Sequence, residues 1–506
     1  MLQRRDNTEA RSSEGKNMTT GQIELLEMKQ TQLYIDGVWS DAAGGESLEV
    51  INPATEDALA TVSYGTASDA RRALEAAHRA LPIWRGTNVY ERAAKLKNLA
   101  DLIRDNVDYL ATALTMEQGK PLTESRGETM ATAGTFEWFA EEAKRAYGRT
   151  IPASANHKRI FTVRHPVGVC ASVAPWNFPI LLTARKIAPA LGVGCTTVAR
   201  PASQTPLSTL RLFELIEQCD FPPGAANLVM GPAAEIMNEF MTNRICRKIS
   251  FTGSTQVGKE LLRNSAGQLK RLSLELGGHA PVIVFPDVDI EAVAKASVIG
   301  KFRNNGQVCI CPTRFYAHKT IENDYIEACV AETKKLVLGN GLDEGVSIGP
   351  MFEPGALKKT DGIVADAKSK GANCITGGGR SERFDRGYFY EPTVMTNIRE
   401  DMAVMTEEPF APVMPILDFD SIDEAIQKAN DTPYGLAAYV LTNDITSAYK
   451  MADQLEFGTI GINDTVPATP QAPFGGLKES GIGRENAIEG MDVYLETKTV
   501  SLALRE

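Results

Sequence analysis

The alternation of short β-branched runs with helical patterns limits what this chain can fold into more than any other feature. Between residues 166 and 276, strand-like runs such as GVCASVA, CTTVAR and KISF are separated by segments with apolar residues at helical spacing. This rhythm predicts parallel sheets covered by helices on both faces. A second series starts at APVIVF (280–285), and 506 residues are too many for one ordinary core. We therefore expect an α/β protein of two lobes that divide near residues 276–278.

Charge and cysteine usage exclude several classes of protein. The net charge of −11 argues against a nucleic-acid partner, because neutralising phosphates needs clustered Lys and Arg. No apolar run approaches the roughly 20 residues that span a bilayer, so we expect no membrane partner. The eight cysteines are scattered through a long chain, mostly in apolar segments, which is typical of reduced thiols. The sequence therefore favours a cytoplasmic protein.

Two strand ends carry candidate phosphate contacts. Residues 253–259 have the G-x-x-x-x-G-K skeleton of a phosphate loop, but Glu260 stands where a nucleotide triphosphatase needs Ser or Thr to hold magnesium. This excludes an ATPase and leaves two interpretations of Gly253: a turn whose following helix amides meet a pyrophosphate, or a plain strand-to-helix turn. Arg200 and Ser203 follow the strand CTTVAR. Arg200 is either a nucleotide contact at a strand end or an exposed surface arginine.

Five strings share one chemistry, and their order and spacing carry a resemblance. They are PWNFP (175–179), LELGG (274–278), GQVC (306–309), EEPFAPV (407–413) and PFGGLKESGIGRE (473–485). Together they resemble the aldehyde dehydrogenase superfamily, from about residue 33 to the C-terminus. Within the superfamily, strings such as ARKIAPALGVGC and KFRNNGQVCIC are most similar to those of succinate-semialdehyde dehydrogenases.

The resemblance implies an aldehyde dehydrogenase-like architecture, with a Rossmann-type cofactor lobe, an α/β catalytic lobe and a small bridging β-sheet that forms homodimers or homotetramers. The polar N-terminus lacks the apolar segment of a signal peptide, so we expect it to be a flexible extension. The expected boundaries are 1–30 for this extension, 31–147 and 166–276 for the dinucleotide-binding domain, 277–473 for the catalytic domain, and 148–165 and 486–506 for the bridging segments.

Three residues match the catalytic positions of the family. Cys309 matches the nucleophile, whose thiolate makes the aldehyde carbon tetrahedral as a thiohemiacetal. Asn177 matches the side-chain amide that, with the Cys309 backbone N–H, stabilises the developing alkoxide. Glu275 matches the general base that activates water against the thioester, and an apolar setting would raise its pKa. The residues alone leave other interpretations open: a buried thiol, a turn-forming amide and a structural carboxylate.

Seven positions match cofactor contacts, and two of them depart from the common pattern. Where the family usually carries Lys, this chain has Arg200, and where NAD-preferring members often carry Glu it has Ser203. Loss of that acid removes repulsion against a 2′-phosphate, with which Arg200 could pair bidentately. We therefore predict NAD or NADP as cofactor, with NADP use plausible. The matching residues are Trp176, Arg200, Ser203, Gly253, Ser254, Glu408 and Phe410.

The small-molecule substrate predicted by the resemblance is a carboxylated aldehyde. Arg185 and Arg303 match two arginines that hold the distal carboxylate of succinate semialdehyde, and the alternative is that both are helix-surface arginines. Ala468 stands where the family has a substrate-binding Ser, which leaves chain length open. Glutarate semialdehyde and 2-oxoglutarate semialdehyde are therefore alternative substrates.

Cys311 lies two residues after the expected nucleophile. In some succinate-semialdehyde dehydrogenases a cysteine here forms a reversible disulfide with the nucleophile, so we expect Cys311 to be a possible redox partner of Cys309. Buried packing is its alternative. A Cys-x-Cys metal site is not predicted, because the sequence has no second Cys-x-Cys or Cys-x-x-Cys pair. No feature of the sequence points to His279 or His318 as further ligands. A non-catalytic binding protein of the family is a further alternative, against which the presence of both Cys309 and Glu275 argues.

Overall fold

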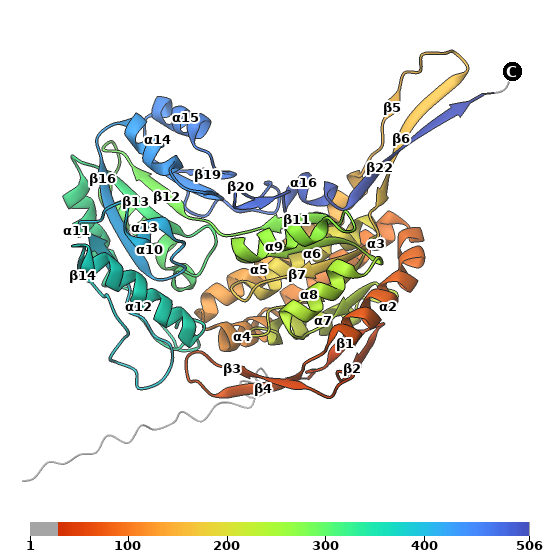
Figure 1. Ribbon diagram of the computed structural model, residues 1–506, viewed down its shortest axis with the longest axis horizontal. Coiled ribbons are helices and arrows are strands. Elements are labelled where there is room, and N and C mark those ends of the chain that lie inside the picture. The colour runs from red at the N-terminus through yellow and green to blue at the C-terminus, as the bar shows by residue number, and fades with distance from the viewer. Residues whose placement is uncertain (1–28, 505–506) are drawn as a thin grey trace, which may run out of the picture.

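The computed structural model describes residues 29–504, so that most of the expected N-terminal extension lies outside the described residues. Two sheets of the predicted α/β type form two lobes, and a small antiparallel sheet extends from the first lobe as an arm (Figure 1). Within residues 29–504, no helix is both long enough and apolar enough to cross a bilayer.

The first lobe contains an eight-stranded sheet whose central strands run parallel. The chain adds strands to one side of β7 and then crosses to the other side, so that the direction of sheet growth changes between β7 and β10. Ligands of doubly wound sheets bind at such a point, outside the carboxyl ends of the strands. The sheet order is β2 (Val38–Ser40), β1 (Leu33–Ile35), β9 (Ala226–Leu228), β8 (Thr196–Arg200), β7 (Val169–Val173), β10 (Cys246–Thr252), β11 (Arg271–Glu275) and β21 (Gly481–Ile482).

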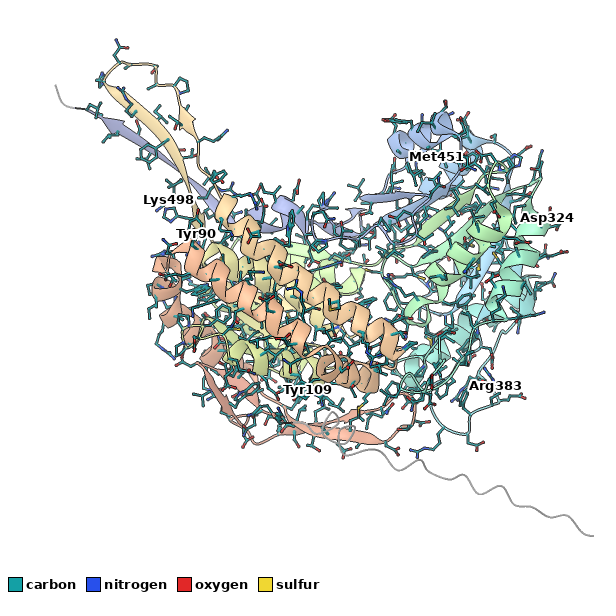
Figure 2. The ribbon with its side chains drawn as sticks, turned by 180° about the vertical axis from the view of Figure 1, so that it is seen from behind. Tyr90, Tyr109, Asp324, Arg383, Met451 and Lys498 are labelled. Carbon is teal, nitrogen blue, oxygen red and sulfur yellow. The ribbon has the colours of Figure 1, made fainter. Side chains whose placement is uncertain are left out.

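Helices cover both faces of this sheet, and the rear view shows the helices of residues 89–142 across its back (Figure 2). The sequence of one helix, PILLTARKIAPALGV, is apolar nearly all round because the helix is buried on nearly every side. The helices are α2 (Ala67–Gly86), α3 (Val89–Asp105), α4 (Val107–Gln118), α5 (Leu122–Glu142), η1 (Ala143–Arg145), α6 (Pro179–Val193), α7 (Leu207–Glu217), α8 (Ala233–Thr242), α9 (Thr255–Ser265) and α16 (Ala487–Asp492).

The second lobe has a seven-stranded sheet that is parallel except for its edge strand β14. Alternate residues of one inner strand, residues 280–284, point into different hydrophobic cores. Val282 and Val284 point into one core and Ile283 into the other, as expected for a sheet covered on both faces. The sheet order is β14 (Asn373–Thr376), β15 (Thr393–Thr396), β16 (Val413–Phe419), β13 (Pro312–His318), β12 (Ala280–Val284), β18 (Ala437–Leu441) and β19 (Thr459–Ile462). Its helices are α10 (Ile290–Phe302), η2 (Arg303–Gly306), α11 (Glu322–Thr333), α12 (Pro354–Ser369), α13 (Ala403–Thr406), α14 (Ile422–Asn430) and α15 (Ile445–Gln454).

The arm is a three-stranded antiparallel sheet of β5 (Thr150–Ile151), β6 (Lys158–Pro166) and β22 (Leu495–Ala503). It projects from the first lobe, and β22 runs along it toward its tip (Figure 1). The expected bridging segment began at residue 486, whereas the structure packs α16 and Tyr494 into the core of the first lobe and starts β22 at Leu495. The shorter pairs β3 (Ser47–Ile51) with β4 (Ala58–Ser63) and β17 (Tyr434–Gly435) with β20 (Leu477–Lys478) complete the sheets.

Candidate active site

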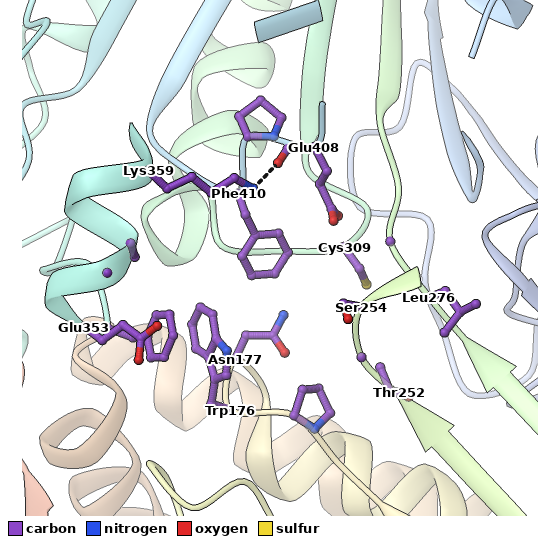
Figure 3. Close-up of a pocket in the computed structure, with 17 residues that line it drawn as sticks. Trp176, Asn177, Thr252, Ser254, Leu276, Cys309, Glu353, Lys359, Glu408 and Phe410 are labelled. Atoms are coloured by element: carbon purple, nitrogen blue, oxygen red, sulfur yellow. Dashed lines mark hydrogen bonds between the residues drawn. The ribbon is translucent and has the colours of Figure 1, made fainter. Parts of the chain in front are cut away.

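A cavity of about 310 Å³ lies where the two lobes meet. The first lobe contributes residues at the carboxyl ends of β7, β10 and β11, and the second contributes residues just before the amino ends of β12, β13 and β16. The loops that follow parallel strands lie at the same edge of a sheet, so each sheet places segments that are distant in the sequence side by side along the cavity. Figure 3 shows the lining residues, which include Trp176, Asn177, Gly253, Ser254, Gly277, Cys309, Phe352, Lys359, Glu408 and Phe410.

Cys309 reaches this cavity from the segment that joins α10 to β13. Asn304, Asn305 and Gly306 adopt positive φ angles of 48°, 56° and 73° in succession, which turns the chain sharply. At Gly306 a Cβ would clash with the carbonyl of Ala411, so glycine is required there. Burial raises the pKa of the Cys309 thiol well above its usual value. The Glu275 carboxylate raises this pKa further, while Arg185 opposes the change.

Glu275 ends strand β11 as a buried carboxylate with only 3% of its surface exposed. Neither of its oxygens has a hydrogen-bond partner within residues 29–504. Burial raises the pKa of Glu275 to about 8; the nearby Glu485 adds to the rise and Lys186 opposes it. A carboxyl group with this pKa and no fixed donor can take up and release a proton near neutral pH.

Glu408 faces the two glycines that follow Glu275. Its Oε1 accepts a hydrogen bond of 3.0 Å from the Gly278 N–H, and burial raises its pKa to about 7. A Cβ on Gly277 would lie 2.7 Å from Glu408 Oε2, and one on Gly278 would lie 2.5 Å from the Cys309 carbonyl oxygen. Close approach of the backbone therefore requires glycine at residue 278, whereas at residue 277 the Cβ would meet the end of a flexible side chain. Lys359 Nζ donates to the Glu408 carbonyl at 2.7 Å (Figure 3).

Asn177 lies in the loop between β7 and α6, and only 3% of its surface is exposed. Its Nδ2 donates to the Gln307 carbonyl at 3.0 Å, which fixes how the amide is turned. The main-chain carbonyl of Asn177 accepts hydrogen bonds from Lys120 Nζ at 2.6 Å and from Asn304 Nδ2 at 3.0 Å. The structure therefore brings Asn177 and the Cys309 loop into one bonded unit.

The residues around the cavity fit a dinucleotide. Strand β10 ends at Thr252, Gly253 follows, and Ser254 caps helix α9, so the amino end of a helix opens on the cavity and suits a pyrophosphate. Trp176 stacks on Phe352 with ring centroids 3.4 Å apart, and Phe410 meets Trp176 edge-on at 5.6 Å. These rings offer flat apolar surface beside the polar groups.

Arg200 and Ser203 lie at the end of β8, outside the lining of this cavity. Arg200 is buried rather than on the surface, and its guanidinium donates to the Gly231 carbonyl at 2.9 Å and to Ser203 Oγ at 3.1 Å. Ser203 Oγ also pairs with the Tyr64 hydroxyl at 3.2 Å. A 2′-phosphate would have to draw this guanidinium away from these contacts.

Neither predicted substrate arginine lines the cavity. The Arg185 side chain is only 10% exposed, lies 4.0 Å from Glu485 and faces the Phe474 ring at 4.6 Å. Arg303 faces the Phe178 ring at 5.5 Å, from the start of η2. Burial of Arg185 excludes its interpretation as a helix-surface residue.

Cys311 is buried, and its sulfur lies 3.5 Å from Lys301 Nζ. All eight cysteines are free thiols in this structure. His279 is held between Thr313 Oγ1 and the Met405 carbonyl, each at 2.8 Å. Within residues 29–504, no group of three or more His, Cys, Asp and Glu side chains is placed to hold a metal ion.

Sequence reasoning missed four buried charged residues close to the site. Lys186 Nζ bonds Thr252 Oγ1 at 2.6 Å and Glu485 Oε1 at 2.7 Å, which places this pair beside Glu275. Lys120 pairs with Glu128 behind Asn177. The signal for Lys186 was available, because a lysine within the apolar run of α6 needs a buried partner. Lys120 and Glu128 stand in segments that give no comparable signal.

Comparison with known proteins places this site in a wider group. The model of the aldehyde dehydrogenase family matches residues 39–500. A glutarate-semialdehyde dehydrogenase from Pseudomonas aeruginosa is 43% identical over 481 residues, which are 95% of this chain and 99% of that protein. The NADP(+) succinate-semialdehyde dehydrogenase of Escherichia coli is 43% identical over 94% of this chain and 98% of its own length. The crystal structure of a succinate-semialdehyde dehydrogenase from Burkholderia pseudomallei matches with a TM-score of 0.93 at 43% identity, covering 97% of this chain and all of that one.

Proposed function

Because this chain belongs to the aldehyde dehydrogenase family, and is an NAD(P)-dependent aldehyde dehydrogenase, we propose that its substrate is a short aldehyde with a distal carboxylate. Succinate semialdehyde is the first candidate, and glutarate and 2-oxoglutarate semialdehydes are the alternatives. The observation that supports the chemistry is the pair of Cys309, which lines the cavity, and the buried Glu275, which lies outside the cavity lining, has no hydrogen-bond partner within residues 29–504 and raises the pKa of the Cys309 thiol.

The proposed reaction begins with Cys309. Its sulfur bonds to the aldehyde carbon, its proton passes to the Glu275 carboxylate, and the carbonyl oxygen becomes an alkoxide. A thiol whose pKa lies well above its usual value needs such a base, and Glu275 is close enough to affect that pKa. The Asn177 amide and the Cys309 backbone N–H would donate to the alkoxide, and each donor is worth roughly 3 kcal/mol in the transition state.

A bound nicotinamide dinucleotide supplies the acceptor for the hydride that leaves the adduct. Gly253 and Ser254 would hold its pyrophosphate at the amino end of α9, and Glu408 and Phe410 would contact its nicotinamide half. After Glu275 has released its first proton to solvent, it takes a second proton from water. That water adds to the Cys309 thioester and releases the carboxylic acid and the thiolate.

The preference for a carboxylated aldehyde rests on Arg185 and Arg303. Neither lines the cavity, but both are at least partly buried and each faces an aromatic ring. A charge-assisted bond to a substrate carboxylate would offset the cost of burying a guanidinium. Relatives named for succinate and for glutarate semialdehyde are equally similar to this chain, which supports both chain lengths.

We also propose that NADP is accepted, because Ser203 leaves no carboxylate to repel a 2′-phosphate beside Arg200.

The free cysteines support a cytoplasmic setting. The arm supports a homodimer or homotetramer, since it is a sheet with open edges that exposes Phe161, Val500 and Leu502. Light scattering of the purified protein would show a dimer or tetramer, and a monomer would contradict this proposal.

A steady-state panel tests the proposed function. Succinate, glutarate and 2-oxoglutarate semialdehydes are each offered with NAD and with NADP, and propionaldehyde serves as the uncharged control. We expect kcat/KM for at least one semialdehyde to exceed that for propionaldehyde by about a hundredfold, the value of one or two charge-assisted hydrogen bonds. Equal rates for charged and uncharged aldehydes would contradict the substrate class.

A further inference from the structure

A layer of bonded polar residues lies directly behind Asn177, and we call it the support layer: Lys120, Glu128, Asn304 and Gln307. Lys120 stands in the short connection between α4 and α5, and its side chain is completely buried. Its Nζ lies 2.7 Å from Glu128 Oε2, 2.6 Å from the Asn177 carbonyl oxygen and 3.9 Å from the centroid of the Phe178 ring. The ammonium therefore joins a carboxylate of α5 to the loop that carries Asn177.

Glu128 fixes the other end of the same loop. Helix α6 begins at Pro179, and its N-cap residue Phe178 has no side chain that can accept a hydrogen bond. Glu128 Oε1 instead accepts the Leu181 N–H at 3.3 Å, so that α5 provides the cap. A carboxylate is favoured at the amino end of a helix, and Lys120 balances its charge.

The support layer holds both the main chain and the side chain of Asn177. Lys120 and Asn304 both donate to its carbonyl, while the Gln307 carbonyl accepts one N–H of its amide. The other amide N–H has no protein acceptor within residues 29–504, and Asn177 lines the cavity. Gln307 and Asn304 also belong to the loop that leads to Cys309. One set of bonds therefore fixes a free donor relative to the thiol.

Stability alone does not account for a completely buried ion pair. Replacing such a pair by apolar residues of similar volume is often neutral or stabilising, because both ions must be taken out of water. Here the remaining bonds of both ions end on residues 177–181, the loop of the proposed oxyanion donor. The pair thus fixes the position of a catalytic loop at a cost in desolvation.

On the basis of the proposed function, we propose that Lys120 is a positioning residue, which together with Glu128 orients the free Asn177 amide N–H toward the alkoxide formed on Cys309. Lys120 does not contact the substrate. Its effect on the reaction passes entirely through Asn177.

A double-mutant cycle tests this dependence. Lys120→Met is made in the parent protein and in Asn177→Ala, and Lys120→Met/Glu128→Gln removes both charges so that no unpaired ion stays buried. In the parent we expect Lys120→Met to lower kcat/KM for the best aldehyde about 30-fold, and in Asn177→Ala at most about twofold, because contacting residues that act as one unit are not additive. Cofactor affinity and alkylation of Cys309 by iodoacetamide should not change.

Lys248→Met is the matched control. Lys248 is a buried lysine of the same lobe whose Nζ bonds Ser273 Oγ at 2.6 Å, and it neither lines the cavity nor contacts Asn177. Its loss should have the same small effect on kcat/KM in both backgrounds. Equal fold losses for Lys120→Met in the parent and in Asn177→Ala would overturn the proposal, as would a loss in Lys248→Met of the same size as in Lys120→Met.

A second measurement separates this proposal from the proposed function. Hydrogen–deuterium exchange of residues 175–182 should be faster in Lys120→Met than in the parent and unchanged in Lys248→Met. If the parent oxidises no aldehyde, the proposed function fails, while the exchange result still decides whether Lys120 holds this loop. Unchanged exchange in Lys120→Met overturns the positioning role whatever the activity.

Discussion

The surroundings of Glu275 and the support layer around Glu128 use the same kind of group in opposite ways. Both carboxylates are buried, with 3% and 4% of their surface exposed, and burial raises the pKa of each. Among residues 29–504, Glu275 has no hydrogen-bond partner on either oxygen, whereas both oxygens of Glu128 accept bonds. A carboxylate that exchanges protons must be free of fixed donors, and a carboxylate that holds a loop must be saturated with them.

The largest effect expected on the cavity side is that of Cys309→Ala. Removal of the thiol leaves no atom to form the covalent adduct, so dehydrogenase activity should fall by at least about a thousandfold. Cofactor binding should persist, because the residues expected to hold the dinucleotide are unchanged. Fluorescence titration with NADPH, alongside the steady-state assay, checks both expectations. Substantial remaining activity would remove Cys309 from the mechanism.

Glu275→Gln tests the unpartnered carboxylate through its pH dependence. The working form of a general base is deprotonated, so activity of the parent should rise as the pH increases through about 8, the pKa of Glu275. Glu275→Gln should lose about 10²- to 10³-fold in rate and lose this rising limb. A pH–rate profile of thioester hydrolysis is the measurement. A rising limb that survives the substitution would assign it to another group.

Glu128→Gln is the matched change in the support layer. It leaves the Lys120 ammonium buried without its counter-charge, and breaking a buried pair costs about 3 to 5 kcal/mol of unfolding free energy. The rising limb of the pH–rate profile should remain, since Glu275 is untouched. Urea unfolding of both carboxylate variants checks the contrast. If Glu275→Gln lowers the free energy of unfolding more than Glu128→Gln does, the contrast between the two carboxylates is wrong.

Arg303→Ala changes a residue next to the support layer. Arg303 faces the Phe178 ring, and its positive charge lowers the pKa of both Glu124 and Lys120. We expect kcat/KM for the best semialdehyde to fall about 10- to 100-fold, as for loss of one charge-assisted hydrogen bond. The value for propionaldehyde should stay within about twofold, because it has no carboxylate to hold. Equal losses for both substrates would assign Arg303 to the support layer instead.

The smallest expected change in basal activity is that of Cys311→Ala. The side chain is buried beside Lys301, and its removal leaves the cavity lining intact. If Cys311 is the redox partner of Cys309, the parent should lose activity to peroxide and regain it with dithiothreitol, while Cys311→Ala should regain much less. Activity before and after each treatment is the measurement. Equal recovery in both proteins would leave Cys311 as a packing residue.

Much of this molecule could be predicted from its sequence. The β–α rhythm predicted two parallel sheets covered by helices, because hydrophobic periodicity is a local property that the chain carries wherever it folds. The ordered strings PWNFP, LELGG and GQVC indicated the family, which the comparisons confirm. The same strings contain Asn177, Glu275 and Cys309, so the sequence by itself pointed to the three residues for which we propose catalytic roles.

Only the tertiary structure decided what surrounds those groups. Burial, and with it the pKa of Glu275, depends on how distant segments pack, and the charges of Glu485 and Lys186 that also change this pKa come from far along the chain. The hydrogen bond from the Arg200 guanidinium to the Gly231 carbonyl and the one from Lys120 to the Asn177 carbonyl each join residues that are distant in the chain. Sequence patterns record the spacing along a chain, whereas the effect of a buried charge depends on its neighbours in space, which are set only when the chain folds.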